Sequence, residues 1–153
     1  MTKRTIKKSI RLNAPKEVVW NVLLDDQFTR KWYAEFSEGS HAETDWQIGS
    51  KAVFTDNTKS GLVGKIIANK THEIISVEYT GFVENGVEDY TSEVAKAVNG
   101  GHETYRLSES NGVTHLSIEC DMTEDCFEFM SLAWDKALQK IKNLSESQLK
   151  LQA

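Results

Sequence analysis

Alternating apolar and polar residues mark the strands of this chain. Residues 5–12 read TIKKSIRL, with the apolar residues on one parity, so this segment is predicted to be a half-buried first strand. Asn111-Gly112 separates two further alternating arms, and because both residue types tolerate positive φ, the pair predicts a tight hairpin turn. Strand-like runs recur along the chain in 51–55, 61–68, 72–83, 102–110 and 113–122.

A spacing of three to four residues marks the helices. Two short helices are predicted after the first strand, one capped by Asn13 with Pro15 in its first turn and one that begins at Asp26. Around 94–98 the spacing predicts either a third short helix or an ordered insertion. The clearest helix is the last one, for which Thr123 is the predicted N-cap and whose apolar stripe is Phe127, Met130, Trp134, Leu138, Ile141 and Leu144 or Ser145.

Residues 33–49 follow neither rhythm, because aromatic residues and glycines stand there among acids and small polar residues. The segment is interpreted as a loop that leads to the strand at 51–55, with pairing of its first half at a sheet edge as the alternative.

This order of elements predicts an α+β fold, in which helices pack on one side of an antiparallel sheet. Residues 1–153 are predicted to form a single domain, since halves of this chain would be too small to bury much apolar surface. A straight helix of more than twenty residues does not lie flush against a twisted sheet. The gap is filled by side chains, by the short helices or by a ligand.

Composition and charge narrow the classes of function. Hydrophobic residues make up 39% and charged residues 27% of the chain, which is typical of a globular protein. No apolar run approaches the roughly 20 residues that cross a bilayer, so stable membrane insertion is not expected. The net charge of −5 and the dispersed basic residues argue against nucleic-acid binding. The basic N-terminal segment lacks the apolar stretch of a secretory signal, so a cytoplasmic location is expected.

Motifs for metals, cofactors and nucleophiles are not found in the sequence. The four histidines have no metal-ligand spacing, and Cys120 and Cys126 are expected to be reduced, buried thiols. No metal and no cofactor are therefore predicted. Glu103 shares the parity of Tyr105, which predicts that it faces the concave side of the sheet, and His102 next to it could also point inward. These two are the candidates for acid–base catalysis, although a solvated or structural role is the simpler interpretation of each.

Aromatic and sulfur-containing side chains form the more informative set. They can either line an adaptable pocket, in which tyrosine hydroxyls orient a ligand, or make up an ordinary core. The sequence alone does not decide between these two interpretations. The candidate ligand-binding residues are Trp32, Phe36, Phe54, Tyr79, Tyr105, Met122, Phe127, Met130 and Trp134.

Several segments together resemble a known superfamily. They are APKEVVWNVL after the first strand, KW at the end of a short helix, DWQIGS, ETYRL, GVTHLSIE and AWDKALQKIK in the last helix. The chain resembles the helix-grip superfamily, which includes START domains, birch-pollen-allergen-like proteins and polyketide cyclases. Within it, the chain is most similar to bacterial single-domain homologues of the activator of heat-shock protein 90 ATPase. The resemblance implies a curved antiparallel sheet wrapped around the C-terminal helix, with an apolar cavity between them.

Three functions are compatible with this resemblance, because the fold alone does not determine function. The first is binding of a small hydrophobic or amphipathic molecule without catalysis. The second is interaction with a chaperone, as an activator of its ATPase. The third is a polyketide cyclase-like enzyme that uses Glu103 or His102 with Tyr79 or Tyr105. We expect the first.

Overall fold

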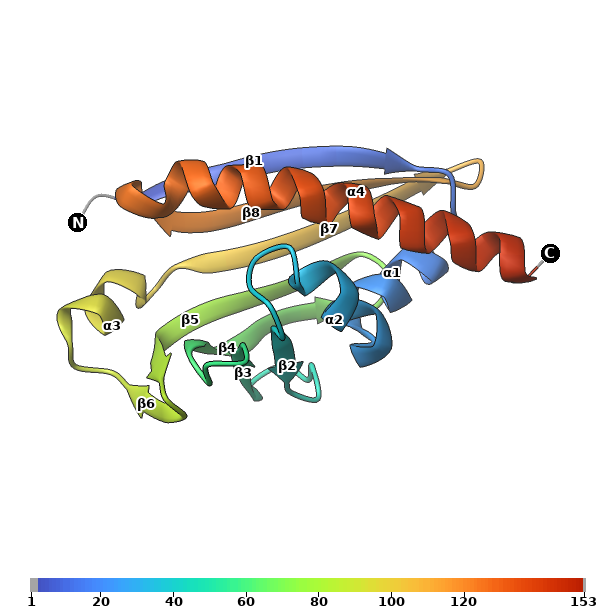
Figure 1. The fold of residues 1–153 in the computed structure, drawn as a ribbon. Coiled ribbons are helices and arrows are strands. Elements are labelled where there is room, and N and C mark those ends of the chain that lie inside the picture. Colours follow the sequence, from blue (N-terminus) through green and yellow to red (C-terminus); the bar gives the residue numbers. More distant parts are fainter. Residues whose placement is uncertain (1–2, 153) are drawn as a thin grey trace.

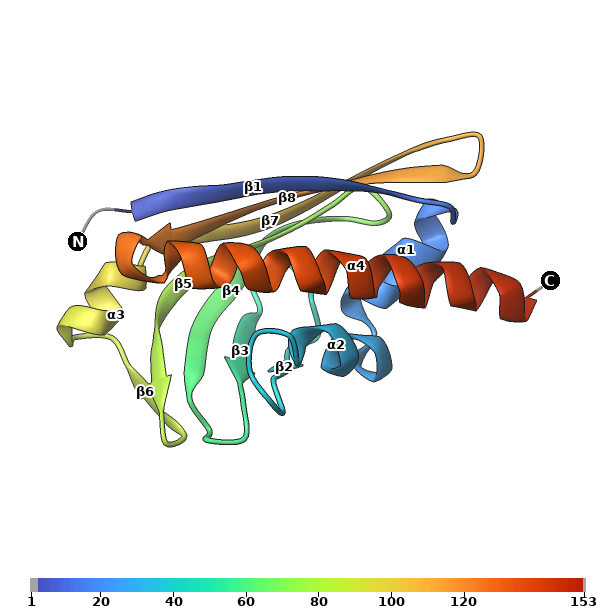
Figure 2. The ribbon, with the colours of Figure 1, turned by 45° about the horizontal axis from the view of Figure 1, so that its top comes forward.

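The structure is a computed structural model that describes residues 3–152, with side chains described through residue 148. Figures 1 and 2 show one long helix lying along the concave side of a curved sheet. In chain order the elements are β1 (Lys3–Leu12), α1 (Lys16–Leu24), α2 (Asp26–Tyr33), β2 (His41–Glu43), β3 (Lys51–Thr55), β4 (Gly61–Lys70), β5 (Ile74–Glu84), β6 (Val87–Asp89), α3 (Glu93–Val98), β7 (His102–Ser110), β8 (Val113–Thr123), the 3₁₀ turn η1 (Glu124–Cys126) and α4 (Phe127–Gln152).

The described strands form one antiparallel sheet in the order β1-β8-β7-β5-β4-β3-β2, and β6 pairs with the end of β5. The pairing of β4 with β5 shifts register between Val63 and Gly64 and again between Ile66 and Ala68. Such irregularities bend a strand and increase its twist. Gly64 is required at the first of them, because a Cβ there would lie 2.4 Å from the carbonyl oxygen of Glu78. The bend contributes to the curvature that Figure 2 shows.

The predicted hairpin between β7 and β8 is confirmed. Asn111 and Gly112 form its turn with φ angles of 53° and 78°, the backbone conformation that a two-residue hairpin of this twist needs. The turn fixes the register that places Leu107 opposite Leu116 on the buried face. The hairpin therefore supplies part of the surface on which α4 packs.

Helix α4 buries one stripe against the sheet, as predicted. Trp134, Leu138 and Ile141 are buried, whereas Phe129 and Leu132 on the other face are 66% and 65% exposed. Although α4 is long, neither it nor another helix in the described part of the chain is apolar enough to cross a bilayer. The α+β helix-grip class predicted from the sequence is thus the observed one.

Charged groups hold the two ends of α4 to β1 and to the segment that follows it. The Lys8 ammonium lies 2.6 Å from a carboxylate oxygen of Asp135. Near the other end, Glu146 accepts a hydrogen bond of 2.9 Å from the backbone N–H of Asn13. These contacts join segments more than 120 residues apart in the chain.

Both predicted N-caps are wrong. Helix α1 begins at Lys16 with Pro15 in the cap position, and no side chain caps it; the backbone N–H of Asn13 is instead directed to Glu146. Thr123 precedes η1 rather than α4, and its side chain makes no capping hydrogen bond. In both cases the chain reverses direction from strand to helix over several residues, so the polar residue nearest the apolar run is not the one at the helix start.

The segment 33–49 contains more structure than a loop. His41–Glu43 forms β2, which pairs with β3 at the sheet edge, and this was the alternative interpretation of the segment. Turns and bends make up most of the remainder. Trp46 adopts a positive φ of 62°, and its carbonyl accepts a hydrogen bond from Asn69 on β4. These contacts attach the segment to the sheet.

We predict that Ile141→Ala lowers the free energy of unfolding by about 2–5 kcal/mol, because Ile141 is fully buried between α4 and the sheet. Leu132→Ala, on the exposed face of the same helix, should change it by no more than about 0.5 kcal/mol. Urea denaturation followed by circular dichroism measures both. A loss below about 1 kcal/mol for Ile141→Ala would show that this contact is not tightly packed.

Candidate functional site

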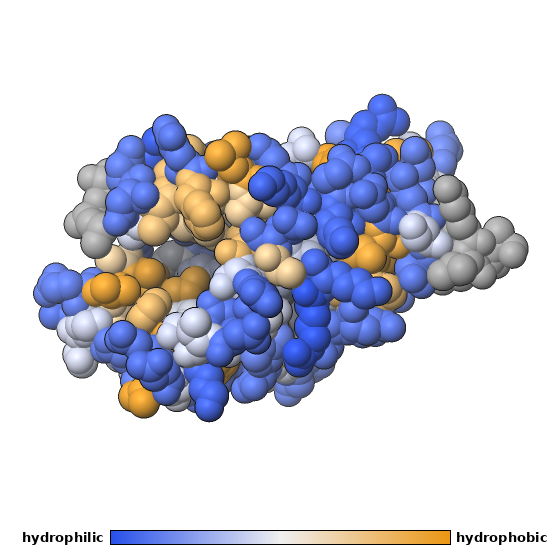
Figure 3. All heavy atoms as spheres, viewed as in Figure 1, coloured by the Kyte–Doolittle hydropathy of each residue, from blue (hydrophilic) through white to orange (hydrophobic). Residues whose placement is uncertain are grey.

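A cavity of about 200 Å³ lies between α4, α2 and the concave face of the sheet. Its described walls are mostly aromatic and aliphatic. Figure 3 shows a hollow with apolar side chains at its rim, between the first half of α4 and the segment around α3, where a second hollow described below adjoins this cavity. The cavity is lined by Trp32, Tyr33, Phe36, Ser37, Ser40, Phe54, Thr55, Asp56, Ser60, Gly61, Leu62, Tyr79, Glu103, Tyr105, Met122, Met130 and Trp134.

Aromatic rings support one another around Trp134. Its ring centroid lies 6.0 Å from that of Trp32, 4.9 Å from that of Phe36 and 5.8 Å from that of Tyr105. Two of these pairs are edge-to-face, an arrangement that aromatic quadrupoles favour. Because α2, α4 and β7 each contribute a ring, the cavity wall is fixed by the packing of three elements.

The Glu103 carboxylate is held by hydroxyl donors from two strands. Tyr79 on β5 donates to Oε1 over 2.7 Å, and Tyr105 on β7 donates to Oε2 over 2.6 Å. The Cys120 thiol on β8 makes a weaker contact of 3.4 Å with Oε1. Alternation along β7 places Glu103 and Tyr105 on the same face, and β5 and β8 flank that strand. The local sequence E-T-Y therefore builds the carboxylate and one of its donors together.

The surroundings of Glu103 strongly disfavour negative charge on its neighbours. Burial, and then the nearby Glu103 carboxylate, raises the pKa of Tyr79, of Tyr105 and of Tyr33 well above the usual value. The same two causes, in the same order, raise the pKa of the Cys120 thiol. These four groups stay protonated at neutral pH, and Tyr79, Tyr105 and Cys120 direct their hydrogens at Glu103.

The structure brings eight of the nine predicted ligand-binding residues to the cavity wall. Phe127 is the exception. It stands in the first turn of α4 and packs on the β1 side, where the Arg4 guanidinium lies 3.7 Å from its ring centroid. Because η1 shifts the start of the helix, Phe127 faces this edge rather than the cavity, and the prediction that it lines the site is wrong.

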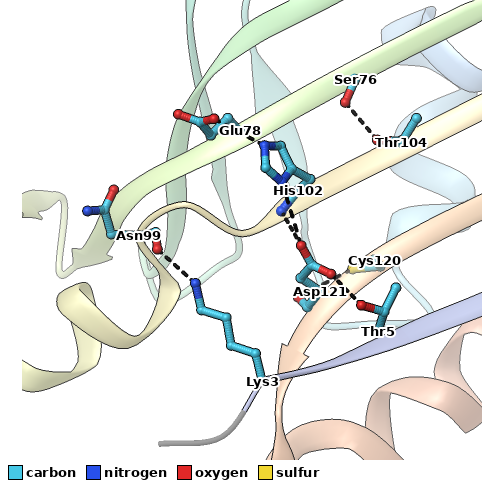
Figure 4. A network of polar contacts seen from close by, with 9 residues as sticks. All are labelled: Lys3, Thr5, Ser76, Glu78, Asn99, His102, Thr104, Cys120 and Asp121. Atoms are coloured by element: carbon cyan, nitrogen blue, oxygen red, sulfur yellow. Dashed lines mark hydrogen bonds and ion pairs between the residues drawn. The ribbon is translucent and has the colours of Figure 1, made fainter.

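Of the two candidate acid–base residues, Glu103 faces the cavity and His102 does not. Figure 4 shows His102 between Glu78 and Asp121. Its Nε2 lies 3.1 Å from a Glu78 carboxylate oxygen, and its backbone N–H donates to Asp121 over 2.9 Å. Asp121 also accepts a hydrogen bond from Thr5. Successive residues of a strand point to opposite faces, so the expectation of an inward His102 is wrong.

Sequence reasoning missed the part of the wall that follows α2. Ser37 donates to Asp56 over 2.6 Å, which joins this segment to the turn between β3 and β4. Hydrogen bonds from Ser37 and Thr58 lower the pKa of Asp56 to about 2. Tyr33 was also missed, although it directly follows Trp32 in α2. Tyr33 and Ser37 lie in the segment 33–49, which has no clear rhythm, and Asp56 follows the predicted strand at 51–55, so no periodic pattern marked these residues.

A second hollow of about 320 Å³ adjoins the cavity beside α3 and the start of α4. Cys126, on its wall, is exposed, whereas Cys120 is buried. The prediction of two buried thiols is therefore correct only for Cys120, because η1 carries Cys126 outside the core. The two hollows share four wall residues, namely Leu62, Tyr79, Met122 and Met130.

The described residues contain no group of three or more His, Cys, Asp or Glu side chains arranged to hold a metal ion. The buried indole Nε1 of Trp134 has no hydrogen-bond partner among them either. The nearby indole nitrogen lowers the pKa of the Cys120 thiol slightly. Burial and the Glu103 carboxylate raise that pKa by more, so the thiol stays protonated.

Solved structures with the same arrangement of sheet and helix define the class of protein. Protein MLL2253 from Mesorhizobium loti superposes with a TM-score of 0.73 at 15% identity, over 94% of this chain and 98% of that one. The Aha1 dimer structure from Colwellia psychrerythraea superposes with a TM-score of 0.69 at 15% identity, over 92% of this chain and 94% of that one. CalU16 from Micromonospora echinospora superposes with a TM-score of 0.65 at 18% identity, over 97% of this chain and 80% of that one. At these identities the likenesses show that the chain shares the fold of these proteins.

The family follows from the sequence itself. The model of the family described as "Activator of Hsp90 ATPase homolog 1-like protein" matches residues 13–146, so the chain belongs to that family. None of the curated proteins compared matches the sequence significantly. Family membership is thus shown, and the role of this member has to be argued from its site.

We predict that the two thiols differ strongly in reactivity. With 5,5′-dithiobis(2-nitrobenzoate) at pH 8, exposed Cys126 should react rapidly, and Cys120 should react only as the protein opens, because it is buried and its raised pKa keeps the thiol protonated. Cys126→Ser should remove the fast phase and leave the slow one. Two equally fast thiols would contradict the buried position of Cys120 beside Glu103.

Proposed function

We propose that this protein binds a small amphipathic molecule in the cavity between α4 and the sheet, without catalysing a reaction. The observation that carries the proposal is the combination of an apolar, largely aromatic wall with one hydrogen-bonded carboxylate at Glu103. Binding sites for small molecules commonly have this composition, in which the apolar surface provides affinity and a few polar groups fix orientation.

The size of the cavity limits the ligand. An apolar cavity of about 150 Å³ can take up benzene, so the 200 Å³ available here suits a single ring with a short substituent. A longer tail would continue past Met122 and Met130 into the second hollow of about 320 Å³. Methionine side chains adapt readily to different ligand shapes, which suits them to this shared boundary.

The same geometry supports binding over acid–base catalysis. Both carboxylate oxygens of Glu103 already accept hydrogen bonds from tyrosine hydroxyls. A general base has to be within hydrogen-bonding reach of the proton that it removes, and these two hydroxyls hold the carboxylate as a fixed acceptor. His102, the other candidate, is engaged with Glu78 outside the cavity. A cyclase-like reaction thus has less support than binding.

We predict that Met130→Trp weakens binding of a neutral probe, 4-phenylbutanol, at least about tenfold. Met130 borders both hollows, and an indole there would occupy space that the probe needs. The control is Leu132→Trp, which adds an indole to the exposed face of the same helix. Dissociation constants come from NMR titration of the ¹⁵N-labelled protein. Equal affinity of the two variants, or no saturable binding by the wild type, would contradict the proposal.

A second candidate function is interaction with a chaperone of the Hsp90 class. It is favoured by the family description and by Phe129 and Leu132, two large apolar side chains exposed one turn apart on α4. Exposed apolar residues that lie together can serve as a contact surface for another protein.

This second candidate predicts that excess protein raises the ATP turnover of a bacterial Hsp90, and that Phe129→Ser reduces the stimulation. Ile48→Ser is the matched control, because Ile48 is similarly exposed but lies outside α4. A coupled ATPase assay measures all three. Unchanged turnover at saturating wild-type protein would eliminate this function and leave ligand binding unaffected.

A further inference from the structure

We infer that the ligand of this cavity is an organic cation, namely a small arylalkyl amine in its protonated form. This inference rests on the proposed binding function and adds the chemical class of the ligand. It is argued from the charge of the wall, from the direction of its hydrogen bonds and from its aromatic rings.

Glu103 contributes a negative charge for which the cavity offers no positive partner. The described residues that line the cavity include no Lys, Arg or His, and the second acidic group among them, Asp56, is held by hydroxyl groups. None of the ion pairs between described residues involves Glu103. A partly buried charge is costly unless it is paired. A bound cation would supply the missing partner.

The hydrogen bonds around Glu103 leave acceptors for a ligand. Tyr79 and Tyr105 both direct their hydroxyl hydrogens at the carboxylate, so their own oxygens can only accept a further hydrogen bond. A carboxylate has about four acceptor positions. The two hydroxyls occupy one on each oxygen, and the weaker contact from the Cys120 thiol takes a second on Oε1, so Oε2 keeps a position open. A protonated amine carries three donors and no acceptor, and a ligand carboxylate carries only acceptors. The arrangement around Glu103 therefore matches the amine.

Two further polar groups border this site without opposing the amine. The Tyr33 hydroxyl is in none of the hydrogen bonds between described residues, although the side chain is buried and lines the cavity. It can accept from a ligand or donate to Glu103. The unpartnered indole nitrogen of Trp134 is a donor, but it is fully buried near Cys120 rather than exposed to the cavity.

The aromatic rings suit a cation in addition to an apolar group. Trp and Tyr attract cations over the ring face, with the strongest effect where water is excluded. The ring centroids of Trp32, Tyr105 and Trp134 lie within 6.2 Å of one another, on the wall that borders Glu103. The negative charge that raises the pKa of Tyr79 and Tyr105 also disfavours an anionic ligand at the same place. Fatty acids and other carboxylates should therefore be excluded.

Three probes of nearly equal size and shape test this inference. They are 4-phenylbutylamine, 4-phenylbutanol and 4-phenylbutanoate, which at pH 7 are cationic, neutral and anionic. Dissociation constants are measured by NMR titration at low salt for the wild type, for Glu103→Gln and for Glu119→Gln. The last is the matched control, since Glu119 is exposed on β8 and its replacement changes the net charge by the same amount.

We expect the wild type and Glu119→Gln to bind the amine at least about tenfold more tightly than the alcohol, and the carboxylate most weakly. Glu103→Gln should bind amine and alcohol with affinities within about threefold of each other. Equal affinities for amine and alcohol in the wild type, or an unchanged preference in Glu103→Gln, would overturn the inference and leave the binding function standing. Binding of none of the probes would overturn both.

Circular dichroism and thermal unfolding establish that Glu103→Gln is folded. If Glu103→Gln does not fold, the inference is tested by the order of the three affinities in the wild type and in Tyr105→Phe. That variant removes one donor to Glu103 and keeps the ring. It should preserve the preference for the amine, because the carboxylate and the aromatic wall remain, and a reversed preference would contradict the inference.

Discussion

The site depends on the mismatch between a curved sheet and a straight helix. Helix α4 packs closely against the sheet around Leu138 and Ile141, where the interior is filled. Toward the start of α4 the sheet curves away, and α2 and α3 approach the gap from its two ends. Because backbone curvature rather than a missing side chain creates the space, single substitutions in the wall change its volume without abolishing it. The fold and the cavity have the same origin.

One partly buried carboxylate, that of Glu103, gives the apolar cavity its main polar group. Three strands, β5, β7 and β8, direct Tyr79, Tyr105 and Cys120 at Glu103. Each of these donors is kept protonated by burial and by the charge that it contacts. The pairing of β7 with both neighbours fixes their spacing, so the polar centre is as rigid as the sheet itself. For the proposed ligand, this centre offers an acceptor that is already oriented, which lowers the entropic cost of binding.

The sequence predicted what periodicity encodes and failed where tertiary contacts decide. Alternation of apolar and polar residues predicted the strands and put Glu103 and Tyr105 on the same face of one strand. Helical spacing predicted the buried stripe of α4. Phe127 shares that spacing, yet η1 moves the helix start and turns the ring toward Arg4. Asp56 and Ser37 could not be predicted as neighbours, because they are 19 positions apart and most of the chain between them follows no clear rhythm. Whether the aromatic set enclosed a space depended on sheet curvature, which no local pattern specifies.

The energetics of Glu103 support the proposal that its polar centre serves a ligand rather than the fold. A partly buried carboxylate without a cation is costly, and apolar replacements of buried charged groups are often neutral or stabilising. The strand register places Glu103 opposite Cys120 on β8 and Val77 on β5, which are both buried, so an apolar side chain at this position would have apolar neighbours. The carboxylate and its two tyrosine donors instead occupy a part of that surface that borders the cavity. This position is explained if the group completes its interactions only when the cavity is occupied.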